Sequence, residues 1–188
     1  MIMDRYVVFD VETPNSRNHR MSSIGVSVVE GGKIVEEFGT LVNPECPFAQ
    51  FNIDLTGITP ELAAKAPTFP EVWKKLLPIL GSGILVAHNA PFDMGVLAKC
   101  LRGYGIAWKP TAQYLCTCQM GRVAYPQLPN HKLNTLCDYC GITLDHHKAE
   151  SDSSAAAQLL ISYLQGGLSP QRFLRNYDLT QIRTASRW

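Results

Sequence analysis

The chain has 188 residues and a formal net charge of +1, with 46% hydrophobic and 18% charged residues. These values predict one soluble globular domain, and the small net charge excludes a general basic field, so a nucleic-acid partner would need a local site. No apolar run reaches the length of a membrane span, and the N-terminus enters the first strand without a signal segment. We therefore expect a cytoplasmic protein with no membrane partner.

The first elements predicted along the chain are strands. Three runs are rich in β-forming residues: residues 5–12, 24–29 and 34–42. Gly31-Gly32 between the last two runs is a hairpin signal, so the strands are expected to form an antiparallel meander. A loop rich in Pro, Asn and Asp is expected over residues 43–59, and a short helix begins at Pro60.

Helices and short strands alternate in the following part of the chain. Apolar periodicity predicts helices at residues 70–80, 92–102, 132–140 and 149–164. Short apolar runs predict strands at residues 84–87 and 113–117. An antiparallel start followed by strands flanked by helices predicts an α/β fold, with a five-stranded mixed sheet covered by helices on both faces.

The C-terminal end is expected to form a basic helical tail. We divide the chain into a main domain, residues 1–166, and a tail, residues 167–188. Ser169-Pro170 has the character of a helix start, and from residue 165 onward four arginines and one aspartate give a net charge of +3. Three apolar residues at helical spacing predict that the tail packs on the domain: Phe173, Leu174 and Tyr177.

Four carboxylates stand where the pattern calls for apolar side chains. Asp10 and Glu12 are two positions apart in a strand, so both point to one face. Asp93 and Asp152 each begin the apolar face of a predicted helix. Singly, such acids are often helix caps or exposed edge-strand residues. Four inward-facing acids without a cation would be very costly, and hard oxygen ligands favour Mg²⁺ or Mn²⁺.

A carboxylate cluster of this size suits two metals roughly 3.5–4 Å apart, which predicts phosphodiester hydrolysis. Histidine is the usual base for such a reaction. His146 and His147 precede the helix of Asp152 and lie within reach of its first turn, whereas three others are expected to be structural or exposed: His19, His88 and His131.

The cysteines offer a weaker alternative metal site. Cys116 and Cys118 form one pair, and Cys137 and Cys140 form another, in a pattern loosely similar to a zinc site. Their apolar neighbours and helical spacing favour buried core positions instead.

Three stretches resemble the motifs of the DEDDh 3′–5′ exonucleases, a family that includes the proofreading epsilon subunit of bacterial replicative DNA polymerases. They are VVFDVET at 7–13, VAHNAPFD at 86–93 and HKAESD at 147–152. The resemblance covers roughly residues 5–165 and implies a ribonuclease H-like fold with Asp10 and Glu12 on the central strand. It also selects His147 over His146 as the base. The loop beginning at Pro14-Asn15 departs from the family pattern.

The resemblance implies a metal-dependent 3′–5′ exonuclease. Asp10, Glu12, Asp93 and Asp152 would bind two Mg²⁺ or Mn²⁺ ions and, with His147, form the catalytic set. Water would attack the last phosphodiester and release a nucleoside 5′-monophosphate. Three residues beside these ligands are expected to contact the terminal nucleotide, the aromatic one by stacking: Thr13, Asn89 and Phe92.

The expected substrate is single-stranded DNA or a frayed 3′ end, with DNA preferred over RNA and a DNA polymerase as a candidate partner. An exoribonuclease with the same chemistry stays open, because no residue pattern locates contacts to a 2′-OH. A non-catalytic nucleic-acid-binding or polymerase-docking module is disfavoured, because it would not need four buried acids. No pattern indicates an oligomeric state.

Overall fold

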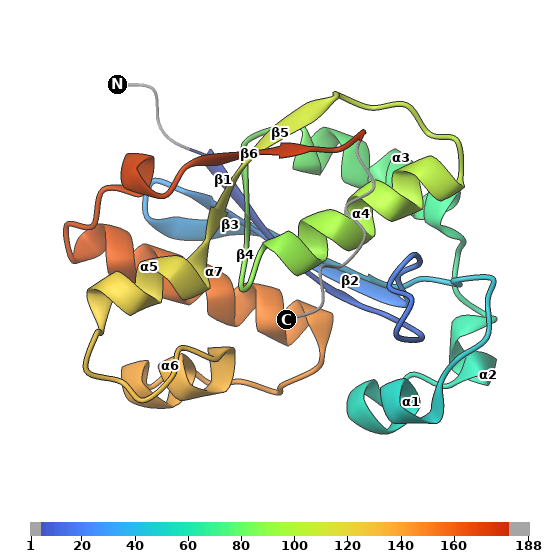
Figure 1. Cartoon of the computed structure of the whole chain (residues 1–188), viewed down its shortest axis with the longest axis horizontal. Helices are drawn as coiled ribbons and strands as arrows, with labels where there is room; N and C mark the ends of the chain where they lie inside the picture. Colours follow the sequence, from blue (N-terminus) through green and yellow to red (C-terminus); the bar gives the residue numbers. More distant parts are fainter. Residues whose placement is uncertain (1–4, 181–188) are drawn as a thin grey trace.

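The computed structural model describes residues 5–180 and consists of a mixed β-sheet with helices on both faces (Figure 1). The sheet has six strands in the order β3-β2-β1-β4-β5-β6. Their bounds are β1 Arg5–Glu12, β2 Ser23–Glu30, β3 Lys33–Leu41, β4 Ile84–Ala87, β5 Thr111–Cys116 and β6 Arg175–Asp178. The first three strands are antiparallel, β4 and β5 run parallel to β1, and β6 is antiparallel to β5.

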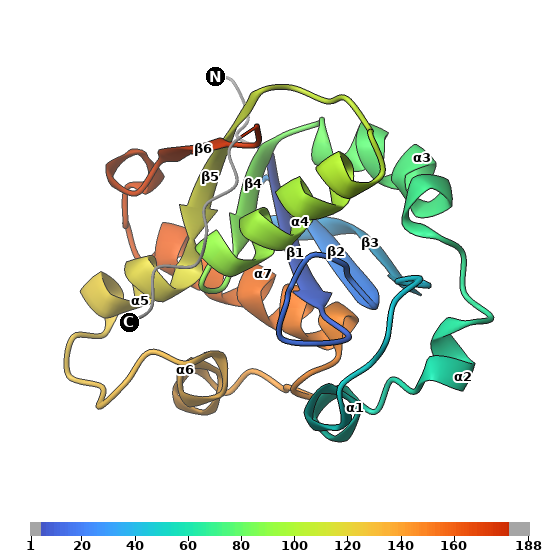
Figure 2. The ribbon, with the colours of Figure 1, turned by 45° about the vertical axis from the view of Figure 1, so that its right-hand side comes forward.

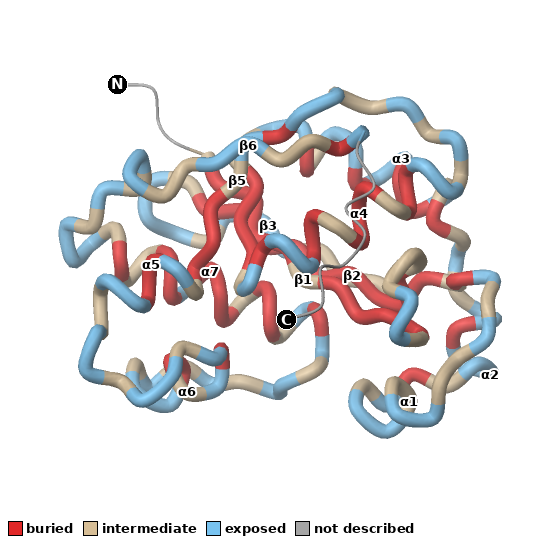
Figure 3. The backbone as a smooth tube through the Cα atoms, viewed as in Figure 1, coloured by how far each residue is buried: buried red, intermediate tan, exposed pale blue. Residues whose placement is uncertain are grey.

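Two hydrophobic cores fill the two faces of the sheet. Val7 and Phe9 of β1 pack toward α3 (Phe69–Leu80) and α4 (Pro91–Gly103), whereas Tyr6 and Val8 pack toward the opposite helices. Those helices are α5 Thr117–Ala124, α6 Leu133–Cys140 and α7 Ala149–Gln165. Burial in Figure 3 follows this arrangement, with the central strands and the inner helix faces buried. Because side chains alternate along a strand, β1 contributes residues to both cores.

The buried members of the two cysteine pairs lie in different cores. Cys116 belongs to the core under α3 and α4, and Cys137 to the core under α5, α6 and α7. Among residues 5–180, neither of the two side-chain groups that could hold a metal ion contains a cysteine, which favours core positions over a zinc site.

Two short helices stand at the end of the sheet where β1 terminates. They are α1 Gln50–Thr56 and α2 Pro60–Ala63. α1 buries none of its side chains. It is attached by hydrogen bonds to the segment after β1: the Asn52 amide donates to the Thr13 carbonyl at 2.8 Å, and the Ala49 N–H donates to the Pro14 carbonyl at 2.8 Å.

The structure corrects the prediction of five strands, because the tail contributes a sixth. After a three-residue 3₁₀ turn, η1 Pro170–Arg172, the chain forms β6 along β5, with Tyr114 opposite Arg175. The ring of Tyr177 meets that of Tyr114 edge to face at 6.1 Å between centroids. The expected helix begins at Pro170 but is wrong for residues 173–178, because pairing with the open edge of β5 satisfies backbone groups that a short helix would leave to solvent. Residues 181–188 of the predicted tail lie outside the described part.

Two further helices were not expected from the sequence. α1 lies within the stretch predicted to be a loop, residues 43–59, and α5 follows β5 directly. Within residues 5–180, no helix combines the length and the apolar character that a membrane crossing requires.

Candidate active site

All eight residues predicted for the site line one cavity of about 940 Å³, at the end of the sheet where β1 terminates. Asp10 and Glu12 lie at the C-terminal end of β1, Asp93 in the first turn of α4 and Asp152 in the first turn of α7. The same cavity is lined by the remaining four: Thr13, Asn89, Phe92 and His147. Three elements far apart in the sequence thus bring their acids to one place.

The carboxylates lie close enough to share a cation. Oxygen atoms of Asp10, Glu12 and Asp152 all lie within 4.8 Å of one another. Asp93 stands outside that group and is fixed to the same strand, because its Oδ1 accepts a hydrogen bond from the Val11 N–H at 3.1 Å. Asp93 is therefore held beside the strand position that lies between Asp10 and Glu12.

Burial makes the charged form of these acids unfavourable. It raises the pKa of Glu12 to about 8, that of Asp93 to about 8 and that of Asp152 to about 7. Burial, and then the negative charges of Asp93, Asp152 and Glu12, hold the pKa of Asp10 well above its usual value. Each cause would be opposed by a positive ion among the oxygens.

The donor atoms fit a hard divalent cation. The Oδ1 atom of Asp152 is buried and has no hydrogen-bond partner, although such an atom normally has one. Carboxylate oxygens are the ligands that Mg²⁺ and Mn²⁺ prefer, and among the described residues the three-acid group contains no sulfur or nitrogen donor. A bound divalent ion would satisfy the unpaired oxygen and would oppose the burial and repulsion that raise these pKa values.

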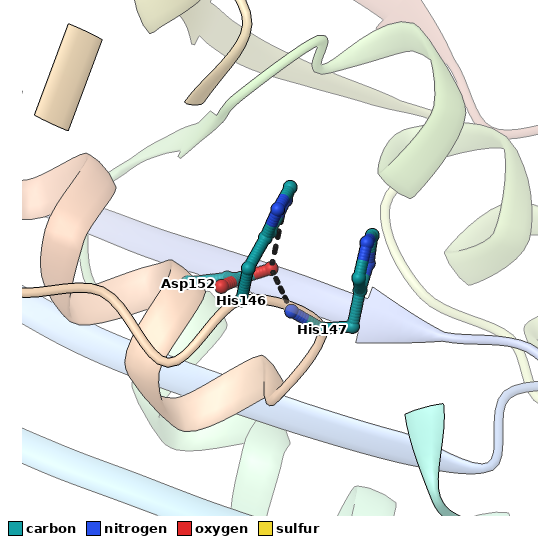
Figure 4. Close-up of side chains that lie close together, drawn as sticks. All are labelled: His146, His147 and Asp152. Atoms are coloured by element: carbon teal, nitrogen blue, oxygen red, sulfur yellow. Dashed lines mark hydrogen bonds and ion pairs between the residues drawn. The ribbon is translucent and has the colours of Figure 1, made fainter. Parts of the chain in front are cut away.

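The turn before α7 brings two histidines to Asp152. His147 has φ +67°, an uncommon conformation for a residue other than glycine, and its backbone N–H donates to Asp152 Oδ2 at 3.1 Å. The ring of His146 stacks on that of His147 with 3.9 Å between centroids, and its Nε2 lies 3.8 Å from the same Oδ2 (Figure 4). Burial lowers the pKa of both rings, which favours the neutral form that a base requires. The geometry presents both rings to the cavity.

The other histidines hold the fold around the site. His88 follows β4; its Nδ1 lies 3.0 Å from the Thr117 hydroxyl and its Nε2 3.0 Å from the His131 carbonyl oxygen. Burial lowers the pKa of His88 to about 4. The ring of His131 in turn contacts the Tyr125 carbonyl oxygen through Nε2 at 3.0 Å. His88 and His131 both line the cavity. Their hydrogen bonds connect the end of β4 with the segment before α6. His19 does not line this cavity.

The structure adds cavity residues that the sequence did not identify. Phe51 and Leu55 of α1 line the cavity and are 72% and 40% exposed, and Phe92 is 40% exposed. They form an apolar wall, and exposed apolar side chains gathered at a cavity are typical of a binding site. Arg122 and Lys132 add positive charge to the lining. The four-residue spacing of Phe51 and Leu55 was the available signal.

Comparisons with known proteins agree with this geometry. The family model RNase_T, described as an exonuclease, matches residues 7–160. The chain is 38% identical over 165 residues to the DNA polymerase III PolC-type of Bacillus subtilis (strain 168), covering 86% of this chain and 12% of that protein. It is also 38% identical over 160 residues to the PolC-type polymerase of Clostridium perfringens, covering 84% and 11%. The chain thus spans about an eighth or less of these relatives.

Solved structures share the fold. One is exonuclease X in complex with 5′ overhanging duplex DNA, with a TM-score of 0.73 and 24% identity, covering 89% of this chain and 96% of that one. Another is the nuclease domain of 3′hExo, a DEDDh family member, bound to rAMP, with a TM-score of 0.75 and 21% identity, covering 89% and 94%. At these identities the likeness establishes a ribonuclease H-like exonuclease fold.

Proposed function

Because the chain belongs to the RNase_T family of exonucleases and is a 3′–5′ exonuclease of the DEDDh type, we propose that it shortens single-stranded DNA or frayed 3′ ends and releases nucleoside 5′-monophosphates. The observation that carries this proposal is the meeting of four acids from β1, α4 and α7 with His147 in one cavity. Asp10, Glu12, Asp93 and Asp152 would hold two Mg²⁺ or Mn²⁺ ions. When bound, such ions orient the phosphate and stabilise the charge that develops on its oxygens.

His147 is proposed as the general base. As the neutral ring it would take a proton from the attacking water, while the bond from phosphorus to the 3′ oxygen of the preceding nucleotide breaks. The hydroxide formed from the water makes the new bond to phosphorus, and the released oxygen takes a proton from solvent to become the new 3′-OH. The bond between the His147 N–H and Asp152 fixes the backbone of the base relative to the acids. The stacked ring of His146 limits the directions in which the His147 side chain can turn.

The cavity walls support a single-stranded substrate. An unpaired terminal base could lie against Phe92, with the apolar side chains of Phe51 and Leu55 nearby in the same cavity. Thr13 and Asn89 would make polar contacts with the same nucleotide. The Thr13 hydroxyl is already oriented by its hydrogen bond to Asn18 Oδ1 at 3.0 Å. A duplex end would need to open before its base could reach this wall.

A polymerase is the proposed partner. Relatives that align with this chain include PolC-type polymerases, of which the chain spans 11–12%. A domain with this activity could act on the 3′ end that a polymerase presents. This proposal concerns the partner alone, and the chemistry above does not depend on it.

Product analysis tests the proposed function. The wild type and the His147→Ala variant would be incubated with 5′-labelled single-stranded DNA and RNA of one sequence, in Mg²⁺, Mn²⁺ or EDTA. We expect a ladder that shortens from the 3′ end of DNA, requires the metal and slows by about 10²–10⁴-fold in the variant. Degradation of RNA with DNA intact would reassign the substrate. No degradation of either strand by folded wild type with metal would refute the proposal.

A further inference from the structure

A second cavity, of about 450 Å³, lies beside the catalytic one and is basic. Three of its lining residues are arginines and none is an acid: Arg122, Arg172 and Arg175. The whole chain is nearly neutral, with 17 basic and 16 acidic residues. Three guanidinium groups around one cavity are therefore a local concentration of positive charge. We call this cavity the β5–β6 basic pocket.

Three separate elements build the β5–β6 basic pocket. Arg122 comes from α5, Arg172 from η1 and Arg175 from β6, which is paired with β5. Figure 2 shows η1 and β6 on the same side of the molecule as α5. The Arg175 Nη1 donates to the carbonyls of Arg172 and Leu174 at 3.3 and 2.9 Å, so its guanidinium is held over the turn. Arg172 and Arg175 lie beyond residue 160, where the match to the family model ends.

The two cavities share a wall. Asn89 and Arg122 line both of them. Asn89 lies in the tight connection between β4 and α4, where its backbone is left-handed with φ +61°. A chain-like ligand that leaves the catalytic cavity past these two residues enters the β5–β6 basic pocket directly.

The two cavities carry opposite charge. The catalytic cavity contains four acids, which repel the phosphates of a nucleic acid wherever no cation intervenes. Positive side chains just outside it would hold the neighbouring phosphates of the same strand. The aromatic side chains of Tyr114 and Phe173 also line the β5–β6 basic pocket, and such faces can stack bases without regard to sequence.

We propose that the β5–β6 basic pocket binds the phosphates of the substrate strand on the 5′ side of the bond that is cut. This inference rests on the proposed function for the direction of the strand. Arg172 and Arg175 would contact phosphates one or more nucleotides away from the reacting one. Arg122, on the shared wall, would lie between these contacts and the catalytic cavity.

The test compares an Arg172→Gln/Arg175→Gln variant with a Lys74→Gln/Lys75→Gln control. The control removes the same charge from an exposed part of α3 that lines neither cavity. Binding of a labelled 20-nucleotide single strand is measured by fluorescence anisotropy in EDTA at 50 and 200 mM salt, so that no catalysis is needed. Hydrolysis of the strand is compared with that of the p-nitrophenyl ester of thymidine 5′-monophosphate, which has no upstream nucleotide.

The logarithm of the association constant falls linearly with the logarithm of the salt concentration, and losing two phosphate contacts should make this slope shallower by about 1.4. Between the two salt concentrations the wild type should therefore lose about sevenfold more affinity than the variant. At the lower salt concentration the preference for the strand over the ester should fall on the order of tenfold. The control should keep the wild-type slope and preference.

A salt slope unchanged in the arginine variant, or an equal loss on strand and ester, would overturn the inference. Because Arg175 also bonds to the turn, Arg172→Gln alone provides a second variant, with an expected slope change of about 0.7. A wild type that degrades nothing but binds the strand with an arginine-dependent slope would overturn the proposed function and support the pocket.

Discussion

Neutralising one buried carboxylate should stabilise the protein when divalent cations are removed. Asp152 suits this test, because it is 4% exposed and its Oδ1 has no hydrogen-bond partner. Asn at this position keeps an acceptor for the His147 N–H. Burial raises the pKa of Asp152 from 3.8 to about 7, so between these values the folded protein holds a proton that the unfolded chain releases.

This difference in bound protons determines how the stability depends on pH. The folded state binds more protons than the unfolded state, so the free energy of unfolding falls as the pH rises from about 4 and stops falling just above pH 7. A pKa shift of about 3 units, at about 1.36 kcal/mol per unit, lowers the free energy of unfolding by about 4 kcal/mol at pH 8. At pH 5 only part of this loss has occurred, about 1.5 kcal/mol. Asp152→Asn removes this loss. It also removes a charge that raises the pKa of Asp10 and Glu12.

The assay is urea unfolding followed by tryptophan fluorescence, in EDTA at pH 5 and pH 8. We expect Asp152→Asn to be more stable than the wild type by about 4 kcal/mol at pH 8 and by about 1.5 kcal/mol at pH 5. Saturating Mn²⁺ should reverse the order at pH 8, because the wild type alone keeps the full ligand set. Asp138→Asn, at an exposed position on α6, should change stability by less than about 0.5 kcal/mol. A variant less stable than the wild type at pH 8 in EDTA would refute the reasoning.

Four other substitutions test the site. His147→Ala should lower kcat on single-stranded DNA by about 10²–10⁴-fold, whereas His146→Ala should lower it less than tenfold; the opposite order would make His146 the base. Gly25→Ala should destabilise the protein by about 1–3 kcal/mol in thermal unfolding and weaken Mn²⁺ binding, because its Cβ would meet the Ala149 carbonyl oxygen at 2.1 Å and displace the start of α7; unchanged values would contradict this close packing. Phe51→Ala should raise KM for DNA about 5- to 100-fold with little effect on melting, since its side chain is 72% exposed; an unchanged KM would exclude it from substrate binding.

The acidic centre could be predicted because its residues interrupt regular patterns. Asp93 and Asp152 stand on helix faces that are otherwise apolar, and Asp10 and Glu12 stand on a buried strand. In each case the pattern fixes the direction of the side chain, and the structure brings all four to one cavity. The direction was predictable from local sequence, but the distances between the acids depend on how the elements pack.

Elements without a buried face escaped prediction. α1 buries none of its side chains, and the spacing of Phe51 and Leu55 is too short an apolar pattern to predict a helix, so Phe51 was not recognised as a cavity residue. β6 is a four-residue strand of polar character, RNYD, whose formation depends on the unpaired edge of β5 rather than on its own sequence. The left-handed conformation of His147 has only a weak signal in its residue type, since histidine adopts positive φ more often than most residues but still uncommonly.

The weak attachment of α1 has a consequence for which bases the enzyme accepts. Because α1 contributes no residue to either core and is hydrogen-bonded through Asn52 and Ala49, we expect it to shift by small amounts at little cost in hydrophobic burial. We therefore expect one wall of the catalytic cavity to adjust its width, while the elements that carry the acids, β1, α4 and α7, are held by the cores. We expect purines and pyrimidines to be removed at similar rates, with adaptation to base size confined to the side of the cavity that performs no chemistry.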